Sequence, residues 1–386
     1  LKGSEIRPLI MAFEDLHWMD ESSEDVLRYL LENISGARVF LIFTYRPEFV
    51  HTWGGRSYHS QVNLNRFSNR ESLAMATYLL NTEDMDRDLE DFILEKTEGI
   101  PFFIEEFIRS LKDLDIIESR DGRSYLKKGI QDITVPATIQ DLIMARIDSL
   151  PEGAKEVLQT GSAIEREFSY ALIRRVMGIP EQEFLTHLSV LKDSELLYER
   201  GIHPQTTYIF KHALTQEVAY DSLVKQRRRD IHTRIARGME ELYADRIEEH
   251  FEMLSHHYEQ SGHAAKAVDY LILAGEKSNK QKAVQAASEF FQKALELSES
   301  ERIELTPETK VRVHRGRARA SFNIGDIDTA AEGYRKVIEI SRRQGMLDQE
   351  RKGLLGLTSM TVSYTHLTLP TTKALGVCGG GGGGGR

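Results

Sequence analysis

Two adjacent carboxylates, Glu14 and Asp15, directly follow a short apolar run over residues 8–13. Runs of this kind are typical of buried strands in a parallel sheet, and open α/β sheets bind their ligands at the carboxyl ends of such strands. There one acid can hold Mg²⁺, often through water, while its neighbour orients the water that attacks a phosphate. The residues alone leave a second interpretation open, namely two solvated acids on a loop.

A third candidate is Arg46, which follows another apolar and β-rich run, residues 39–45. Between the two runs, residues 20–31 predict a helix with a capping side chain at its start and one apolar stripe. Strand, helix and strand in this order predict a βαβ unit with a parallel sheet, so Arg46 is expected beside Glu14 at the same edge. A planar, always charged guanidinium suits a γ-phosphate, and the alternative is a surface arginine.

The wider segments around these residues resemble a known family. Residues 9–23, LIMAFEDLHWMDESS, closely resemble the Walker B region of STAND-class (AAA-like) P-loop ATPases, and residues 44–48, TYRPE, resemble the sensor segment of the same class. The resemblance implies that Glu14 is the acid linked to Mg²⁺, that Asp15 orients water and that Arg46 contacts the γ-phosphate of ATP. Family members often have two aspartates here, so Glu14 is a variation.

Two further segments resemble the same family. Residues 99–111, GIPFFIEEFIRSL, resemble the GxP motif of the helical lid, in which the proline contacts the nucleotide base. Pro101 is the matching residue, and its alternative role is to begin a helix. Residues 210–220, FKHALTQEVAY, resemble the end of the winged helix, in which a histidine approaches the β-phosphate of bound ADP and holds the closed state. His212 is the matching residue, since an imidazole can donate to phosphate, and its alternative is a core histidine.

The pattern along the chain is mainly helical. Helices are expected over residues 68–113, followed by a hairpin at 116–126, helices over 139–192, two short strands at 196–199 and 207–210, and helix again from 227 to 351. Together with the resemblance, this predicts a multidomain, mainly α protein. Its expected parts are a partial α/β P-loop NTPase core (1–66), a helical lid (67–130), a winged-helix domain (131–225) and an α-α solenoid of tetratricopeptide-like repeats (226–355).

An internal repeat supports the solenoid. Small, aromatic and aliphatic residues recur at an offset of 43: Ala287, Phe291 and Ala294 match Ala330, Tyr334 and Val337. Tetratricopeptide repeats have a period of about 34, so the longer offset predicts an inserted segment at residues 298–309. One such unit cannot bury its own apolar face, and neighbouring units must therefore stack on it.

One motif of the family is not found in this sequence. No segment matches G-x-x-x-x-G-K-[ST], the loop whose backbone N–H groups cradle the phosphates. The sequence opens at Leu1 rather than at a methionine. We therefore expect a fragment whose phosphate-binding loop lies upstream, and which by itself neither binds ATP tightly nor hydrolyses it.

The last residues, 361–386, are expected to be an artefact rather than part of the protein. Residues 362–372, VSYTHLTLPTT, resemble the translation of a transposon adapter used in sequencing libraries, and seven consecutive glycines follow at 379–385. Segments of this kind are excluded from fold reasoning, and the alternative is a genuine flexible tail. Cys378, the one cysteine of the sequence, lies in this tail, so no disulfide is expected.

Composition and charge limit the partners and the cellular location that can be expected. The formal net charge of -10 argues against broad attraction to nucleic acid or to acidic membranes. Neither a bilayer-spanning apolar run nor a signal peptide is visible, so a cytoplasmic location is expected. A basic patch at residues 225–234 is interpreted as a solvated helix face; because a winged helix can bind DNA, nucleic acid stays an unfavoured partner.

The favoured hypothesis is a signal-transducing ATPase switch that binds ATP or ADP with Mg²⁺. ADP would hold the winged helix on the nucleotide core, and a protein partner sensed by the repeats would loosen it. ATP would then enter and release an effector domain outside this chain, as differential affinity of two states for two nucleotides allows. The alternatives are a non-catalytic repeat scaffold and an ATP-dependent transcription regulator.

Overall fold

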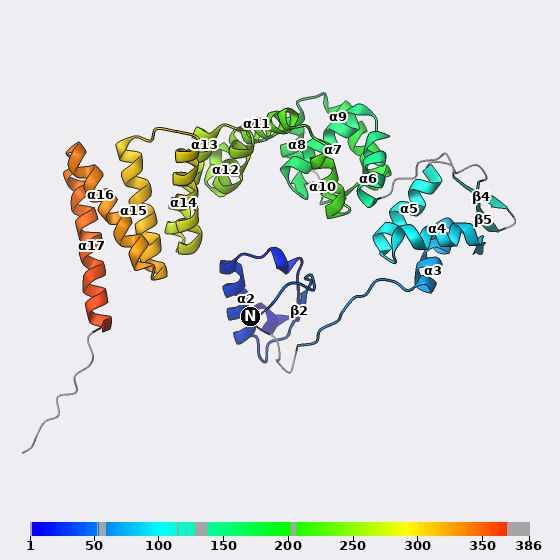
Figure 1. Ribbon diagram of the computed structural model, residues 1–386, viewed down its shortest axis with the longest axis horizontal. Coiled ribbons are helices and arrows are strands. Elements are labelled where there is room, and N and C mark those ends of the chain that lie inside the picture. Colours follow the sequence, from blue (N-terminus) through cyan, green and yellow to red (C-terminus); the bar gives the residue numbers. More distant parts are fainter. Residues whose placement is uncertain are drawn as a thin grey trace, which may run out of the picture. The chain divides into compact units, whose positions relative to one another are not determined.

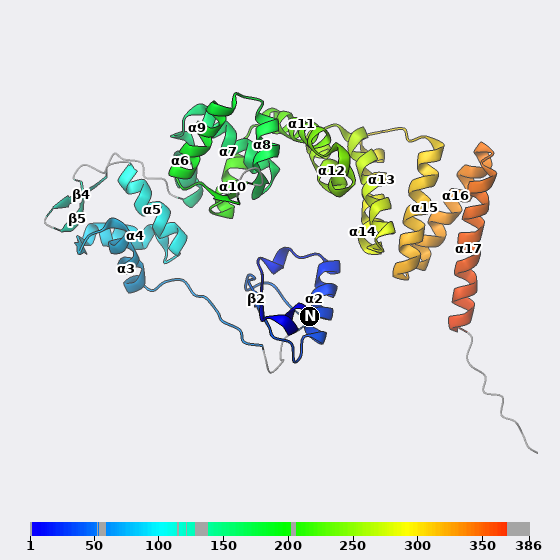
Figure 2. The same cartoon turned by 180° about the vertical axis from the view of Figure 1, so that it is seen from behind.

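The structure of the protein is a computed structural model, which describes residues 2–51, 53, 59–113, 116–120, 122–127, 138–201 and 206–368. The chain forms two compact units, Leu1–His263 and Ala264–Arg386. Helices dominate both units, and small sheets occur in the first (Figures 1 and 2), which confirms the predicted mainly α class. Within the described residues, no helix is both long and apolar enough to cross a membrane.

The first unit begins with the predicted βαβ arrangement. Its elements are α1 (Lys2–Ile6), β1 (Leu9–Phe13), the 3-10 helix η1 (Leu16–Trp18), α2 (Glu21–Asn33) and β2 (Val39–Phe43). β1 and β2 pair in parallel along their full length. Helix α2 begins where the Asp20 carboxylate accepts the Ser23 N–H at 2.8 Å. Leu27 and Leu31 of α2 are buried in a core to which both strands contribute.

Three helices and a small sheet form the region predicted as the lid. The elements are α3 (Asn69–Leu80), β3 (Asp84–Met85), α4 (Arg87–Thr97), α5 (Pro101–Asp113), β4 (Ile117–Arg120) and β5 (Arg123–Leu126). β4 and β5 form the predicted hairpin, and β3, too short to recognise in the sequence, pairs with β5. Gly99 has a φ of +73°, and a Cβ there would come within 2.3 Å of the Phe67 carbonyl oxygen. The close approach of these two backbones therefore requires the glycine of the GxP segment.

The region predicted as a winged helix consists of helices and a three-stranded antiparallel sheet. Its elements are α6 (Ile139–Asp148), α7 (Glu152–Ile164), β6 (Glu167–Ser169), α8 (Tyr170–Met177), α9 (Glu181–Asp193), β7 (Leu197–Arg200), β8 (Thr207–Phe210) and α10 (Ala213–Asp221). The strand order is β6, β8, β7. The two predicted strands are confirmed as β7 and β8, whereas three-residue β6 is too short to show alternation.

Helix α11 (Lys225–Leu242) packs on α7 and α8, and η3 (Ala244–His250) and α12 (Phe251–Gln260) follow it. Several basic residues of α11 are engaged within the unit. Arg227 and Arg234 pair with Glu156 of α7, and Arg234 also donates to the Val176 carbonyl oxygen at 2.7 Å. Much of the basic patch at residues 225–234 therefore serves packing inside the first unit.

A buried pair of histidines joins α11 and α12. Nδ1 of His232 lies 2.9 Å from Nδ1 of His257, and the Tyr220 hydroxyl lies 2.9 Å from His232 Nε2. Both imidazoles are 1% exposed. Burial lowers the pKa of His232 to about 4 and that of His257 to about 3. A hydrogen bond between the two rings needs one donor and one acceptor, which two neutral imidazoles supply.

The second unit is a stack of long helices, each packed against the next. They are α13 (Ala264–Lys280), α14 (Val284–Ser300), α15 (Pro307–Ile324), α16 (Ile327–Gln344) and α17 (Leu347–Thr368). Phe291 is fully buried at the centre, and a Cβ on Gly316 would come within 2.4 Å of its ring. The predicted repeat stack is thus confirmed in this unit. The boundary predicted between residues 225 and 226 stays a prediction.

The prediction of an inserted segment at residues 298–309 is wrong. Helix α14 continues to Ser300 and α15 begins at Pro307, so only residues 301–306 lie between them. The offset of 43 is made up of α14 and α15, with 17 and 18 residues, and of the connections that follow them, with six and two residues. In the tail, the backbone of residues 361–368 continues α17, and residues 369–386, with Cys378 and the glycine run, lie outside the described residues.

Candidate nucleotide site

Glu14 and Asp15 lie at the carboxyl end of β1. The chain leaving β1 is tied to β2 through Thr44, whose hydroxyl accepts the Asp15 N–H at 3.0 Å and whose carbonyl accepts the Leu16 N–H at 2.9 Å. Asp15 has a left-handed backbone, with φ 56° and ψ 44°. Few residues other than glycine adopt this conformation, and Asp and Asn tolerate it best. This turn fixes both carboxylates at the edge of the strand pair.

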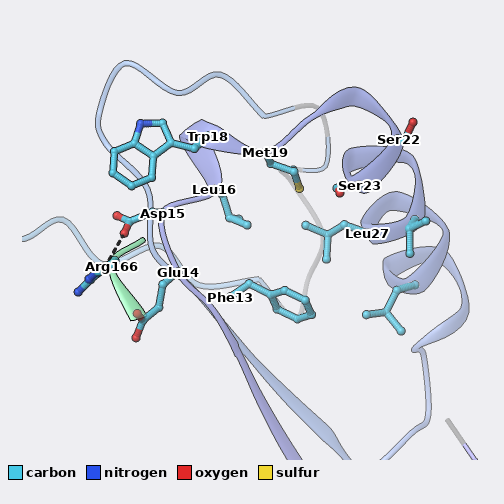
Figure 3. A pocket seen from close by; sticks show the side chains of 12 residues that line it. Phe13, Glu14, Asp15, Leu16, Trp18, Met19, Ser22, Ser23, Leu27 and Arg166 are labelled. Atoms are coloured by element: carbon cyan, nitrogen blue, oxygen red, sulfur yellow. Dashed lines mark ion pairs between the residues drawn. The ribbon is translucent and has the colours of Figure 1, made fainter. Parts of the chain in front are cut away.

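The two acids line an open hollow of about 750 Å³ beside α2. Figure 3 shows the carboxylates on one side of the hollow and α2 on the other. Most of the other lining residues are apolar, namely Phe13, Leu16, Trp18, Met19, Val26, Leu27 and Leu30, and the polar ones are Ser22, Ser23 and Arg166. The hollow therefore combines negatively charged oxygen atoms on one side with an apolar wall on the other.

The two acids differ in their protein contacts. Asp15 Oδ2 lies 3.6 Å from Nη1 of Arg166, which directly precedes β6 (Figure 3). Both side chains are about two-fifths exposed, and such an ion pair contributes about 0–1 kcal/mol. Glu14 is exposed and has no hydrogen bond or ion pair within the described residues. Asp15 is therefore weakly held, and Glu14 is available to a ligand.

Arg46 follows β2 at the same edge, but it does not line the hollow. Its guanidinium carbon lies 6.0 Å from the centre of the Trp18 ring. Because β1 and β2 run parallel, Glu14, Asp15 and Arg46 all follow strand ends at one edge. An arrangement of the three side chains around a phosphate stays a prediction.

The start of α5, where Pro101 lies, is close to His212 through the next residue, Phe102. Pro101 is the first residue of α5, and the ring of the next residue, Phe102, lies 3.9 Å from the His212 ring, centre to centre. His212 is the N-cap residue of α10, and its buried Nε2 has no hydrogen-bond partner within the described residues. Burial lowers the pKa of His212. Since neither residue lines the hollow, the structure brings the sequence-predicted residues together in two groups.

The sequence reasoning missed a charged network beside His212. Glu106 of α5 is 1% exposed and pairs with Arg146 of α6. Arg146 and Arg109 both donate to the carbonyl oxygen of Ser194, at 2.6 and 3.2 Å. These contacts tie α5 to α6 and to the end of α9.

Three more side chains complete this network. Lys211 Nζ lies 2.5 Å from Glu105 Oε1 and 2.8 Å from Glu195 Oε2. Hydrogen bonds from Lys211 and from Arg109 lower the pKa of Glu195 to about 2. Burial opposes the charge on Lys211, but its hydrogen bonds to Glu105 and Glu195 outweigh burial and raise its pKa. Three acids and three bases balance in charge, so the network as a whole is neutral.

The pattern of α5 explains why the network was missed. Ile104, Phe107 and Leu111 form one apolar stripe, and Glu106 and Arg109 lie on the opposite, polar side of the helix. A polar side of this kind normally faces water. Here it faces α6 and the end of α9, and the partners come from positions far along the chain. The sequence signal was only the density of charge on α5.

The same cluster also resembles a metal site in outline. Ligand atoms of Glu105, Glu106 and His212 lie within 4.8 Å of one another. However, Lys211 and Arg146 already pair with the two carboxylates. A divalent metal ion would have to displace the Lys211 and Arg146 side chains or lie next to their positive charges. The geometry therefore favours ion pairs that link helices of the same chain over a metal centre.

Comparisons with known proteins give three findings. A family model described as Domain of unknown function (DUF8739) matches residues 68–124, from the N-cap of α3 into β5. An uncharacterized protein of Rhizobium meliloti (strain 1021) is 25% identical over 355 residues, which are 89% of this chain and 33% of that protein. The chain thus spans about a third of the length of this curated relative.

The third finding is a solved structure, that of a STAND protein with a tetratricopeptide repeat sensor from Pyrococcus horikoshii. It aligns with a TM-score of 0.41 and 13% identity, over 93% of this chain and 65% of that chain.

Proposed function

We propose that the chain is part of a signal-transducing ATPase switch, and that ATP or ADP with Mg²⁺ binds at the carboxyl edge of the β1–β2 pair. One observation carries the proposal: Glu14 and Asp15 are held by a left-handed turn at the end of a parallel strand and line an open hollow. Open α/β sheets bind ligands at this position.

The residues at this edge fit a magnesium nucleotide. Carboxylate oxygens are the hard donors that Mg²⁺ prefers, and Glu14, without a partner among the described residues, would hold the ion through water. When bound, Mg²⁺ neutralises charge on the phosphates. Asp15 would orient the attacking water after leaving Arg166, and Arg46 would donate paired hydrogen bonds to the γ-phosphate.

Two residues outside the β1–β2 pair would complete the nucleotide site: Pro101 from the lid and His212 from the winged helix. The buried Nε2 of His212, which lacks a partner among the described residues, supports a role as donor to a β-phosphate. Pro101 stands next to Phe102, which contacts the His212 ring. In this proposal Pro101 meets the nucleotide base, and His212 senses whether ADP is bound.

The uncovered face of the β1–β2 pair supports a larger core. Ile10 is 74% exposed, Phe40 63% and Ile42 42%. These alternate residues share one face, opposite α2, and both faces of a parallel sheet are normally buried. We infer that further elements of a longer polypeptide, including the phosphate-binding loop, cover this face in the complete core.

The repeat stack supplies the sensing part of the proposal. Stacked helix pairs offer extended surfaces for protein partners, and the effector that they control lies outside this chain. The stack α13–α17, in which each helix packs on the next, also supports the second candidate, a non-catalytic scaffold. An ATP-dependent transcription regulator would need a DNA-binding domain elsewhere in the polypeptide.

Nucleotide binding by the full-length gene product tests the proposal, measured with a fluorescent ATP analogue with and without Mg²⁺. We expect Mg²⁺-dependent binding that Glu14→Gln weakens about tenfold, since a hydrogen bond to a charged group contributes about 1.5 kcal/mol or more. Glu32→Gln, which removes an exposed acid of α2, should leave it unchanged. No binding by a protein with an intact phosphate-binding loop would overturn the proposal, and a gene without that loop would favour the scaffold.

A further inference from the structure

Helix α15 differs in charge from the rest of this acidic chain. Its sequence, PETKVRVHRGRARASFNI, contains five basic residues and one acid, whereas the whole chain has a formal net charge of -10. Arg312, Arg315 and Arg319 are spaced by three and four positions, so they form one stripe along the helix. We call these three residues the arginine stripe.

The stack consists of helix pairs, and α13, α15 and α17 are the first helices of successive pairs. The arginine stripe of α15 contacts the two other first helices, α13 and α17. Arg312 pairs with Glu276 of α13, and Arg315 donates to Gln349 Oε1 of α17 at 2.6 Å. The helices α13, α15 and α17 contact one another in this order, and Figure 2 shows the series from α13 to α17. The first helices of successive pairs therefore form one continuous surface, of the kind that repeat proteins use for binding.

Two arginines of the stripe lack an acidic partner within the described residues. Arg315 donates to an amide, which is neutral, and Arg319 is exposed and makes no hydrogen bond or ion pair there. Like charges four residues apart on a helix repel each other and destabilise the helix. The hydrogen bond from Arg315 links α15 to α17, but no contact within the described residues accounts for a second positive charge at Arg319. The unbalanced charge of the two arginines points to a ligand that neutralises it.

We propose that the arginine stripe binds an acidic segment of a partner protein, with two carboxylates that pair with Arg315 and Arg319. The proposal rests on the proposed function, in which the repeats sense a protein. Guanidinium groups bind carboxylates through paired, charge-assisted hydrogen bonds. Asp269 and Glu276 of α13 lie beside Arg312, and they would repel a long polyanion such as nucleic acid. A short acidic segment on the α15–α17 side avoids them.

Fluorescence polarisation tests this proposal with the full chain. The probe is a labelled peptide of alternating glutamate and alanine, and its control is the same peptide with glutamine for glutamate. The variant pair is Arg315→Glu with Arg319→Glu, and the matched control is Arg335→Glu on α16, an exposed arginine without a hydrogen bond or ion pair within the described residues. Helicity and the thermal midpoint, measured for each variant, verify folding, and Arg315→Gln with Arg319→Gln replaces the reversal if it fails to fold.

We expect the glutamate peptide to bind more tightly than the glutamine peptide. The double reversal should weaken binding of the glutamate peptide about 100-fold, since loss of each of the two charge-assisted hydrogen bonds costs about tenfold in affinity. Arg335→Glu should change affinity less than twofold. Equal affinity for both peptides, or equal losses in both variants, would overturn the proposal. Tighter binding of duplex DNA that depends on Arg315 and Arg319 would replace it with nucleic acid. Nucleotide binding by the full-length protein does not depend on Arg315 or Arg319. If the variants still bind nucleotide but the peptide proposal fails, the proposed function is unaffected.

Discussion

The hollow at Glu14 and the network at Glu106 are built from the same residue types, acids and arginines, but they differ in how their charges are satisfied. In the network, each of the three carboxylates has a cationic partner, and Glu106 is 1% exposed. At the hollow, Glu14 has no partner within the described residues, and Asp15 shares one weak pair with Arg166.

This difference separates charge that the fold needs from charge that it does not. A buried carboxylate must be paired, because the cost of removing it from water is several kcal/mol. The network therefore has a sufficient explanation in the folded chain itself. At the hollow, Glu14 is exposed and Asp15 is partly exposed, and their one ion pair, Asp15–Arg166, contributes at most about 1 kcal/mol. The explanation of these two acids is therefore to be sought in a ligand.

The strongest test of this comparison is Arg146→Ala. It leaves the buried Glu106 without its cation, and we expect a loss of about 3–5 kcal/mol in the free energy of unfolding of the first unit. Urea denaturation followed by circular dichroism measures the loss. The matched control is Arg175→Ala, which removes one partner of a pair with Glu241 that is more than half exposed, and it should cost less than about 1 kcal/mol.

A second variant shows whether the two charges of the Glu106–Arg146 pair stabilise the fold, or whether each charge is needed only because the other is present. Glu106→Leu combined with Arg146→Met removes both charges, and apolar replacements of buried pairs are often neutral or stabilising by about 1–4 kcal/mol. We expect most of the loss in Arg146→Ala to be recovered. A double variant as unstable as the single one would show that packing, not charge, holds α5 to α6.

Asp15→Asn addresses the open side of the comparison. Asparagine tolerates the left-handed backbone at this position, so the fold should be unchanged. In the full-length protein we expect turnover of ATP to fall about 100-fold, the lower range for loss of a positioned proton acceptor, while nucleotide binding persists. Steady-state phosphate release and binding of the fluorescent analogue measure the two effects. Unchanged turnover would remove Asp15 from the proposed mechanism.

Much of the local structure could be predicted from the sequence, but the way in which its parts contact one another could not. The apolar runs before Glu14 and Arg46 predicted β1 and β2, and the recurrence of Phe291 and Tyr334 predicted the stack. These signals are local periodicities. The pairing of Glu106 with Arg146 depends on which polar helix side is covered by a distant element, and no local pattern records that.

The buried pair of His232 and His257 is a third case, in which the buried polar groups carry no charge. The pKa of His232 is lowered to about 4 by burial, so the folded chain resists a proton that the unfolded chain accepts near its ordinary value of about 6.5. The contribution of His232 is present above about pH 6.5 and is lost as the pH falls toward 4. At pH 5 we expect a loss on the order of 2 kcal/mol from this residue. Urea midpoints at pH 7.5 and pH 5 measure this loss together with that from His257, whose pKa is lowered to about 3.

A variant isolates this effect from the titration of acids. His232→Leu with His257→Leu removes both imidazoles while keeping apolar volume at the site. We expect the variant to lose less stability than the wild type between pH 7.5 and pH 5, since the acids remain and only the histidine contribution is gone. An identical pH dependence in both proteins would contradict the assignment.

The smallest effect is expected at Arg166, and it is the most sensitive test of the contrast between the two regions. The Arg166–Asp15 pair is 3.6 Å long and about two-fifths exposed on both sides, so water screens it and Arg166→Ala should change the free energy of unfolding by no more than about 0.5 kcal/mol. A double-mutant cycle with Asp15→Asn measures their coupling directly. Coupling near zero leaves Asp15 free to turn toward a ligand, whereas coupling above about 1 kcal/mol would mean that the hollow is held by its own charges, as the network at Glu106 is.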